Sequence, residues 1–214
     1  MTSRTDESAA RTRIVRTARS LFTRGLTHGS TGNLSVRLAD GTLLLTPTGS
    51  SLGTVEEDEL SRTDLSGKHL DGPRPTKETF LHAAFYRARP GALAVAHLHS
   101  TYAAAVSCLE DVNPADALPP LTAYYAMRVG PLPLLPYHAP GDSSLEPLAE
   151  RTARSHHAVL LANHGPVIAG ASLEQAADAI EELEETAKLH LLLRGHGTRP
   201  LSPEQAAALA PTSP

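Results

Sequence analysis

The stretches ALAVAHLH (residues 92–99) and AVLLANHGPVIAG (residues 158–170) predict the centre of the fold. Each contains an apolar run of strand length, which favours buried strands. His97 and His99 alternate with Leu98, so a strand would place both imidazoles on one face with their Cα atoms about 6.6 Å apart. Leu98 would then point into the core. We therefore expect buried strands that carry histidines at their ends.

Helical and strand patterns surround these stretches. Helices are predicted over residues 8–24, 76–89, 101–109, 144–154 and 173–194, with a short one after Thr198, and strands over 34–38, 42–46, 92–99, 129–137, 158–162 and 167–169. Because helices and strands interleave and several strands are hairpin-connected, we predict one α/β domain over residues 1–214. Its three αβα layers would enclose a mixed, largely antiparallel sheet, and about seven N-terminal and five C-terminal residues would be flexible.

Composition narrows the function classes. The formal net charge of −4 provides no basic surface for nucleic acid or an anionic membrane. No apolar run approaches the length of a membrane span, and no apolar leader core is visible, so we expect a cytoplasmic protein. The single cysteine, Cys108, excludes an intrachain disulfide and is expected to be a buried, inert thiol.

Three histidines and one glutamate form a candidate metal site. His97 and His99 could share one divalent ion at about 2.1 Å, although such a pair alone also fits solvent-facing or hydrogen-bonded histidines. His164 follows an apolar strand in a sharp turn before Gly165, a position suited to a site, although a plain turn histidine has the same pattern. Glu78 begins a predicted helix, where it could either bind the ion or complement the helix dipole.

Two turns rich in glycine and threonine could bind an anion. TGN (residues 31–33) and TPTG (residues 46–49) can each form a backbone nest for a phosphate, or serve as ordinary turns. Of the other histidines, His28 and His82 are expected to border the site, and the rest to be structural or solvated.

Five segments, in their order along the chain, resemble the class II aldolase/adducin family: TGNLS (31–35), TPTG (46–49), PTKE (75–78), HLH (97–99) and NHG (163–165). The resemblance implies that the three histidines bind zinc or a similar ion, and that Glu78 completes the coordination and serves as acid and base. It also implies a substrate-phosphate site formed by Gly32, Asn33, Thr48, Gly49, Thr76 and Lys77. In this set Lys77 adds a cation where the aldolases have a small hydroxyl residue.

Residues 118–142 and 181–195 are most similar to a subgroup of the family, the 3-oxo-tetronate 4-phosphate decarboxylases. The resemblance implies a lyase of carbohydrate metabolism that releases CO2 and dihydroxyacetone phosphate through a metal-stabilised enediolate. It further implies a homotetramer in which Tyr124 of a neighbouring subunit is the general acid, with Tyr125 as the alternative. The apolar end of the last long helix, which includes Leu189 and Leu192, independently favours self-association.

Two other functions remain open at this stage. The first is an aldolase or 4-epimerase acting on a ketose phosphate such as L-fuculose 1-phosphate. The second is a non-catalytic assembly protein similar to the adducin head domain. Three imidazoles and a carboxylate suit one zinc ion per subunit best, although Mn, Co or Fe could occupy the same ligands. The expected substrate is a small phosphorylated keto-acid or keto-sugar, with neither nucleic acid nor a membrane as a partner.

Overall fold

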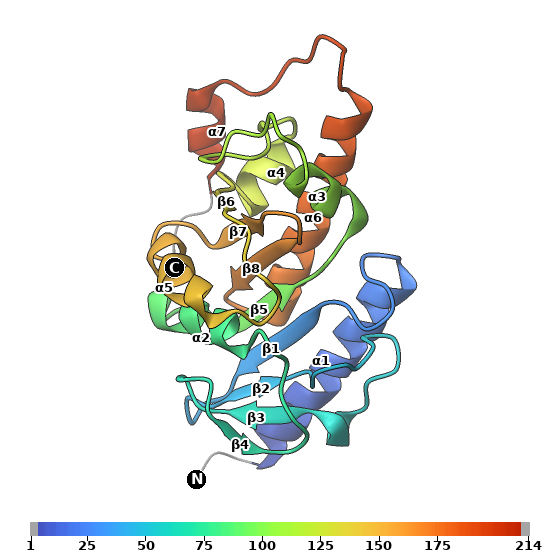
Figure 1. The fold of residues 1–214 in the computed structure, drawn as a ribbon, viewed down its shortest axis with the longest axis vertical. Coiled ribbons are helices and arrows are strands. Elements are labelled where there is room, and N and C mark those ends of the chain that lie inside the picture. Colours follow the sequence, from blue (N-terminus) through green and yellow to red (C-terminus); the bar gives the residue numbers. More distant parts are fainter. Residues whose placement is uncertain (1–3, 211–214) are drawn as a thin grey trace.

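The computed structural model describes residues 4–210, and within them eight strands form one sheet (Figure 1). The strands are β1 (Asn33–Arg37), β2 (Leu43–Leu45), β3 (Ser61–Thr63), β4 (His69–Asp71), β5 (Ala94–His97), β6 (Leu134–Leu135), β7 (Ala158–Leu161) and β8 (Pro166–Gly170). The helices are α1 (Arg4–Thr23), α2 (Thr79–Ala88), α3 (Thr101–Ser107), α4 (Ala123–Arg128), α5 (Glu146–Ala153), α6 (Leu173–Leu192) and α7 (Pro203–Leu209). Two short 3-10 turns are η1 (Glu57–Glu59) and η2 (Ser143–Leu145).

The strand order places β5 at the centre of the sheet. The order is β4-β3-β2-β1-β5-β8-β7-β6, and it runs from bottom to top of Figure 1. Neighbouring strands are antiparallel except for β6 and β7, which are parallel. The register sets Asn33 of β1 and Val167 of β8 on either side of His97. The sheet therefore brings three distant segments together at one end of β5.

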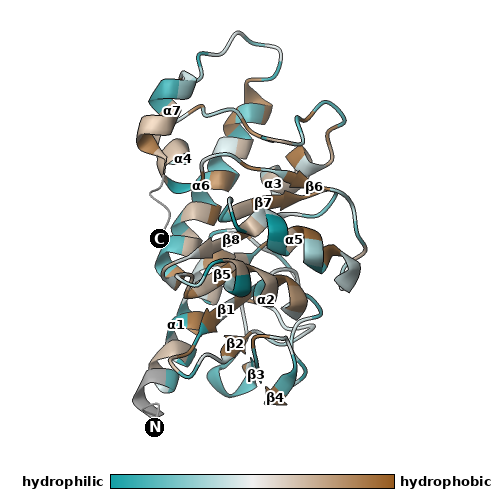
Figure 2. Ribbon diagram, turned by 90° about the vertical axis from the view of Figure 1, so that its left-hand side faces the viewer, coloured by the Kyte–Doolittle hydropathy of each residue, from teal (hydrophilic) through white to brown (hydrophobic). Residues whose placement is uncertain are grey.

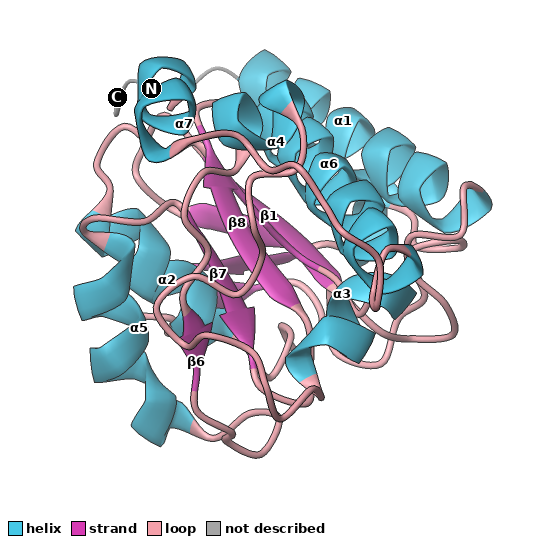
Figure 3. Cartoon of the chain, turned by 90° about the horizontal axis from the view of Figure 1, so that it is seen from above, coloured by secondary structure: helices cyan, strands magenta, loops and turns pink. Residues whose placement is uncertain are grey.

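Helices cover both faces of the sheet, as the predicted αβα architecture requires (Figure 3). One apolar cluster lies under α1, α3, α4 and α6 and includes Leu98, Ile168 and Ile180. A second lies under α2 and α5 and includes Phe85 and Val159. Figure 2 shows the hydrophobic residues concentrated on the central strands, whereas α5 and α7 carry hydrophilic turns. Burial of apolar area in two layers is thus the main stabilising contribution to the fold.

Several element boundaries differ from those predicted. The helix predicted from residue 8 begins at Arg4, because Glu7 pairs with Arg11 one turn later and with Arg62 of β3. Of the ends predicted to be flexible, residues 1–3 and 211–214 lie outside the described residues. The helix predicted from residue 76 begins at Thr79, and Glu78 occupies its N-cap position. The short helix predicted after Thr198 is α7, and a capping box formed by Ser202 and Gln205 begins it.

Two segments were assigned the wrong structure. The polar connector before Pro75 contains η1, β3 and β4, which are too short to give a clear alternation in sequence. The segment predicted as a strand over residues 129–137 forms only the two-residue edge strand β6, since its prolines lack the N–H that a longer ladder needs. Tyr124, which lies in none of the predicted elements, is on helix α4. Cys108, expected to be buried, is exposed at the C-cap of α3.

The C-terminal end of α6 presents apolar side chains to solvent. The relative exposures of Leu189, Leu192 and Leu193 are 38%, 64% and 38%, so the described part of the tail, which includes α7, leaves them uncovered. Among the described residues, every helix is too short or too polar to cross a bilayer.

Candidate metal centre

The strand β5 positions the first two histidines. His97 is its last residue and is fully buried, while Leu98 packs into the core and His99 emerges beyond the strand at the edge of the site. The ring Nδ1 of His97 lies 2.9 Å from the carbonyl oxygen of Pro166. An N–H at Nδ1 donates to that carbonyl and leaves the Nε2 lone pair free to face the site. Such an outer hydrogen bond is typical of a metal-binding histidine.

A tight turn between β7 and β8 delivers His164. Asn163 adopts a left-handed conformation with φ of 55°, which asparagine tolerates better than most residues. A Cβ atom at Gly165 would lie 2.2 Å from the carbonyl oxygen of Leu98, so only glycine allows the turn to pack against the His97–His99 segment. His164 is thereby held against the other two histidines, as its position next to Gly165 predicted.

The three Nε2 atoms converge on one point. They are separated by 3.1 Å (His97 to His99), 3.3 Å (His97 to His164) and 2.9 Å (His99 to His164). Four ligands at about 2.0–2.1 Å from a tetrahedral zinc ion lie roughly 3.3 Å apart, so this spacing matches a metal site. Glu78 completes the cluster: one possible ligand atom from each of the four residues lies within 4.8 Å of those of the other three. The residues present therefore fit a divalent cation.

Glu78 closes the fourth side of the cluster. Its Oε2 lies 3.3 Å from Nε2 of His97, and its Oε1 lies 3.3 Å from Nε2 of His164. Burial raises the pKa of this carboxyl, but the charge of His97, a hydrogen bond from Asn33 and the charge of His164 outweigh burial and lower the pKa to about 2. The group is therefore a carboxylate at neutral pH, as a ligand must be.

His99 and His164 are neutral at the same pH. Burial, followed by the charge of His97, lowers the pKa of His99 to about 3 and that of His164 to about 4. Neutral imidazoles are the form that binds metal, so these two side chains can bind a cation without losing protons first.

Two of the segments predicted to hold a phosphate lie side by side next to Glu78. Pro47 of the TPTG turn forms an isolated bridge to Pro75, and Thr48 donates its N–H to the carbonyl of Arg74 at 3.0 Å. The side chain of Lys77 is exposed, whereas Thr76 is buried and its hydroxyl accepts from the N–H of Glu78. These contacts place the TPTG turn beside the segment that leads to Glu78.

Gly32 and Asn33 have roles that the sequence did not indicate. A Cβ atom at Gly32 would lie 3.0 Å from the carbonyl oxygen of His97, so glycine permits the close packing of this turn on β5. The side-chain amide of Asn33 is buried and donates to Glu78 at 2.8 Å, while its oxygen pairs with His82. A phosphate at this turn would therefore meet backbone N–H groups rather than this amide. Gly49 is exposed with φ of 76°.

Two residues near the site were missed by the sequence analysis. His138, predicted to be structural or solvated, lines a small cavity of about 10 Å³ together with Glu78 and His164. Glu184 of α6 is buried, and its carboxylate accepts hydrogen bonds from the N–H groups of Tyr102 and Ala103 at the start of α3, directly after the His97–His99 segment. Of the two histidines expected to border the site, His28 is exposed and His82 is fully buried.

The two candidate tyrosines differ in access. Tyr124 is 60% exposed, and the guanidinium of Arg128 lies 5.4 Å from its ring centroid. Tyr125 is 1% exposed, and burial raises the pKa of its hydroxyl. Only Tyr124 could therefore reach a second subunit without unfolding of α4.

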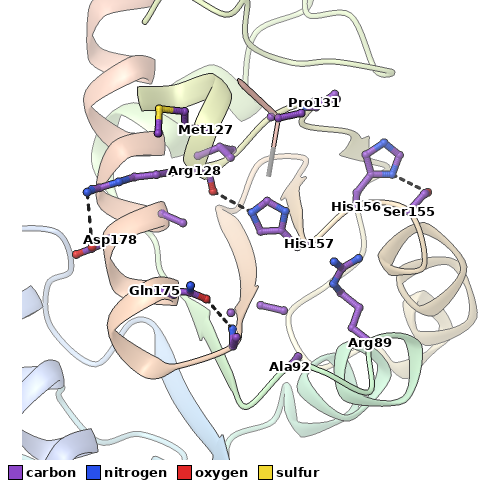
Figure 4. A pocket seen from close by; sticks show the side chains of 17 residues that line it. Arg89, Ala92, Met127, Arg128, Pro131, Ser155, His156, His157, Gln175 and Asp178 are labelled. Carbon is purple, nitrogen blue, oxygen red and sulfur yellow. Dashed lines mark hydrogen bonds and ion pairs between the residues drawn. The ribbon is translucent and has the colours of Figure 1, made fainter. Parts of the chain in front are cut away.

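A larger cavity of about 480 Å³ lies at the opposite end of the central strands (Figure 4). Its polar groups are largely occupied by one another: His157 pairs with the carbonyl of Arg128 at 2.9 Å, and the Arg128 side chain lies 3.7 Å from Asp178. Within residues 4–210, the cluster at Glu78 is the group whose spacing suits a metal ion. The size of this cavity therefore does not make it the better candidate for metal chemistry.

Comparisons with known proteins agree with this geometry. A 3-oxo-tetronate 4-phosphate decarboxylase from Pectobacterium atrosepticum is 48% identical over 204 residues, which cover 95% of this chain and 94% of the relative. An L-fuculose phosphate aldolase from Methanocaldococcus jannaschii is 36% identical over 180 residues, covering 84% of this chain and 94% of the relative. The solved structure of YgbL from Escherichia coli, a proposed aldolase/epimerase/decarboxylase, superimposes with a TM-score of 0.92 at 44% identity and covers 95% of this chain and 98% of that one.

The family model described as Class II Aldolase and Adducin N-terminal domain matches residues 12–191. This range includes every segment that contributes to the metal-type cluster. Since the match spans most of the chain and the relatives align over most of both lengths, the chain belongs to the class II aldolase and adducin family.

Proposed function

We propose that the chain is a divalent-metal-dependent carboxy-lyase that converts a 3-oxo-tetronate 4-phosphate into dihydroxyacetone phosphate and CO2. The convergence of three imidazole Nε2 atoms and one carboxylate carries this proposal. The substrate class follows from the 48% identity to the Pectobacterium decarboxylase. We further propose zinc as the ion, because the ligand set is that of a catalytic zinc site, and the cytoplasm as the location.

The proposed ligands are Glu78, His97, His99 and His164. Three properties support this set: the ligand-type spacing, the neutral imidazoles of His99 and His164, and the contact from His97 to the carbonyl of Pro166, which orients its ring. A bound cation would supply Lewis-acid stabilisation of the negative charge that develops on the ketone oxygen when the C–C bond breaks.

The chain's other residues bind the substrate and move protons. As CO2 leaves, the bonding electron pair stays on the carbon next to the ketone, and a proton added to that carbon yields dihydroxyacetone phosphate. We assign this proton to the hydroxyl of Tyr124 from a neighbouring subunit, with Glu78 as the further acid and base of the site. The TGN and TPTG turns, with Thr76 and the cation of Lys77, would hold the phosphate.

We also propose that the chain self-associates, as a homotetramer by its resemblance to the family. The cavity beside Glu78 and His164 has a volume of about 10 Å³, far below that of a phosphorylated four-carbon acid, which fits a substrate site completed by a neighbouring subunit. Tyr124, Met127 and Leu192 are 60%, 46% and 64% exposed, and their burial between subunits would remove apolar surface from water.

The second candidate is an aldolase acting on a ketose phosphate. The 36% identity to an L-fuculose phosphate aldolase supports it, since both reactions break a C–C bond next to a ketone and leave a comparable charge. A non-catalytic assembly role is less well supported, because such a protein would have no use for four converging ligand atoms.

One assay separates the candidates. Purified protein loaded with Zn2+ is incubated in parallel with a 3-oxo-tetronate 4-phosphate and with L-fuculose 1-phosphate, and CO2, aldehyde and dihydroxyacetone phosphate are measured. We expect equimolar CO2 and dihydroxyacetone phosphate from the first substrate. Faster release of aldehyde from the second substrate would show that the protein is an aldolase rather than a decarboxylase. Turnover of neither substrate with Zn2+, Mn2+ or Mg2+ would contradict both lyase functions.

A further inference from the structure

A chain of buried polar side chains leads away from Glu78 into the core. Asn33 donates its amide N–H to Oε2 of Glu78 at 2.8 Å, and its side-chain oxygen pairs with Nε2 of His82. Nδ1 of His82 lies 2.7 Å from the hydroxyl of Ser35, which lies 2.9 Å from the hydroxyl of Tyr86. All four residues behind Glu78 are at most 5% exposed.

The Glu78 carboxylate determines the direction of every hydrogen bond in this series of side chains. A carboxylate only accepts, so the amide of Asn33 must turn its NH2 group toward Glu78 and its oxygen toward His82. That oxygen also only accepts, so His82 carries its proton on Nε2. In the neutral ring, which full burial favours, Nδ1 then accepts from Ser35, and Ser35 in turn accepts from Tyr86. Each hydroxyl or N–H therefore donates toward Glu78.

This series of hydrogen bonds restrains the Glu78 carboxylate, which accepts few other hydrogen bonds. Among the described residues, Asn33 provides the one non-histidine hydrogen bond to the Glu78 side chain. The two carboxylate oxygens lie equally far, 3.3 Å, from His97 and His164, so the histidines alone do not select one orientation. Asn33 cannot rotate its amide without breaking its contact with His82, and His82 cannot rotate its ring without breaking its contact with Ser35.

We propose that His82, Ser35 and Tyr86 are positioning residues, which act through Asn33 to fix the orientation of Glu78 and thereby the oxygen that it presents to a metal ion. This inference rests on the proposed role of Glu78 as a ligand. It gives a function to a fully buried histidine that lies outside the ligand set. Outer hydrogen bonds of this kind typically change metal affinity about 10- to 100-fold when they are removed.

The test combines matched variants with a readout that is independent of turnover. Ser35→Ala removes the central hydroxyl, and Tyr86→Phe removes the terminal one. Ser61→Ala is the control, because Ser61 is also a fully buried strand serine but its hydroxyl has no hydrogen-bond partner among the described residues. The dissociation constant for Zn2+ is measured by competition with a chromophoric chelator, and the thermal midpoint of each protein is recorded alongside it.

We expect Zn2+ affinity to fall about 10-fold in Ser35→Ala, less in Tyr86→Phe, and not at all in Ser61→Ala. His82→Gln should retain most of the affinity, since its amide can still donate to Asn33, whereas His82→Leu should lose about 10- to 100-fold. Equal affinities of Ser35→Ala and Ser61→Ala would overturn the proposal.

The tautomer of His82 provides a second measurement that needs only the wild-type protein. Nitrogen-15 NMR of labelled histidines should show a proton on Nε2 of His82 and none on Nδ1, with slow exchange against solvent. A proton on Nδ1 would reverse the direction of these hydrogen bonds and overturn the proposal, and this measurement stands even if His82→Leu fails to fold. A protein that shows these affinities and this tautomer, but does not decarboxylate a 3-oxo-tetronate 4-phosphate, would refute the proposed reaction alone.

Discussion

Replacing Glu184 with glutamine should destabilise the protein by about 2–4 kcal/mol. The Glu184 carboxylate is 5% exposed and accepts from the N–H groups of Tyr102 at 2.9 Å and Ala103 at 2.8 Å. A hydrogen bond to a charged group contributes roughly 1.5–3 kcal/mol, and a carboxylate at the first turn of α3 also interacts favourably with the helix dipole. Glutamine can keep one bond, but its NH2 group would face the other N–H and leave a buried donor unpaired.

Urea unfolding of the metal-free protein measures this loss. Circular dichroism is the suitable signal, since the chain contains no tryptophan. Glu185→Gln is the matched control: Glu185 is the next residue and is exposed, so its replacement should change the free energy of unfolding by less than about 0.5 kcal/mol. A loss below about 1 kcal/mol for Glu184→Gln, similar to that of the control, would refute the capping role of this carboxylate.

Three further outcomes are expected. Glu78→Gln should retain substantial metal, held more weakly by the three histidines, while turnover falls on the order of 10²-fold or more, because it removes the base and weakens the ligand; turnover near that of the wild type would exclude Glu78 from the chemistry. Burial lowers the pKa of His82 from 6.5 to about 3, so below pH 6.5 the unfolded chain binds a proton at this residue that the folded protein does not. The contribution of His82 to the free energy of unfolding is therefore fully present above pH 6.5. It decreases by about 1.4 kcal/mol per pH unit as the pH falls from 6.5 toward 3. Urea unfolding of the metal-free protein between pH 7 and pH 5 should show a steeper total slope, because His99 and His164 also have lowered pKa values, and His82→Gln should remove up to one proton from it; identical slopes in the two proteins would contradict this assignment. The variants His97→Ala and Tyr124→Phe, each inactive alone, should recover part of the activity when they are dissociated, mixed and reassembled. If mixed oligomers form, as confirmed by mass, but show no activity, the sites are not shared through Tyr124.

The fold class and the cluster of Glu78 with three histidines could be predicted from the sequence, because both depend on patterns among residues that are close in sequence. Alternation along a strand over residues 92–99 predicts that His97 and His99 lie on one face, although the observed strand β5 ends at His97, and the glycine after His164 marks a turn that can approach that strand. These features depend on neighbours within a few residues. The helix predicted over residues 173–194 is an equally local feature, and it is observed as α6, with Ile180 and Leu183 buried.

The rest depends on contacts between distant residues. Asn33 was assigned to a phosphate because its turn resembles an anion nest, yet its amide pairs with Glu78, 45 residues away in sequence. Glu184 caps a helix that begins more than 80 residues earlier, and a single glutamate within a helical pattern gives no sign of such a partner. Strands β3 and β4 have only three residues each, too few for a periodic signal.

The most direct test of the metal-dependent decarboxylase is a titration of the metal-free protein with Zn2+, in which bound metal and CO2 release from a 3-oxo-tetronate 4-phosphate are measured at each point. We expect turnover to rise in proportion to bound metal and to level off at one ion per chain. The double variant His97→Ala, His99→Ala should bind no ion at this site and release no CO2 while keeping its fold. Undiminished CO2 release from the metal-free protein, or one ion per chain in the double variant, would contradict the assignment.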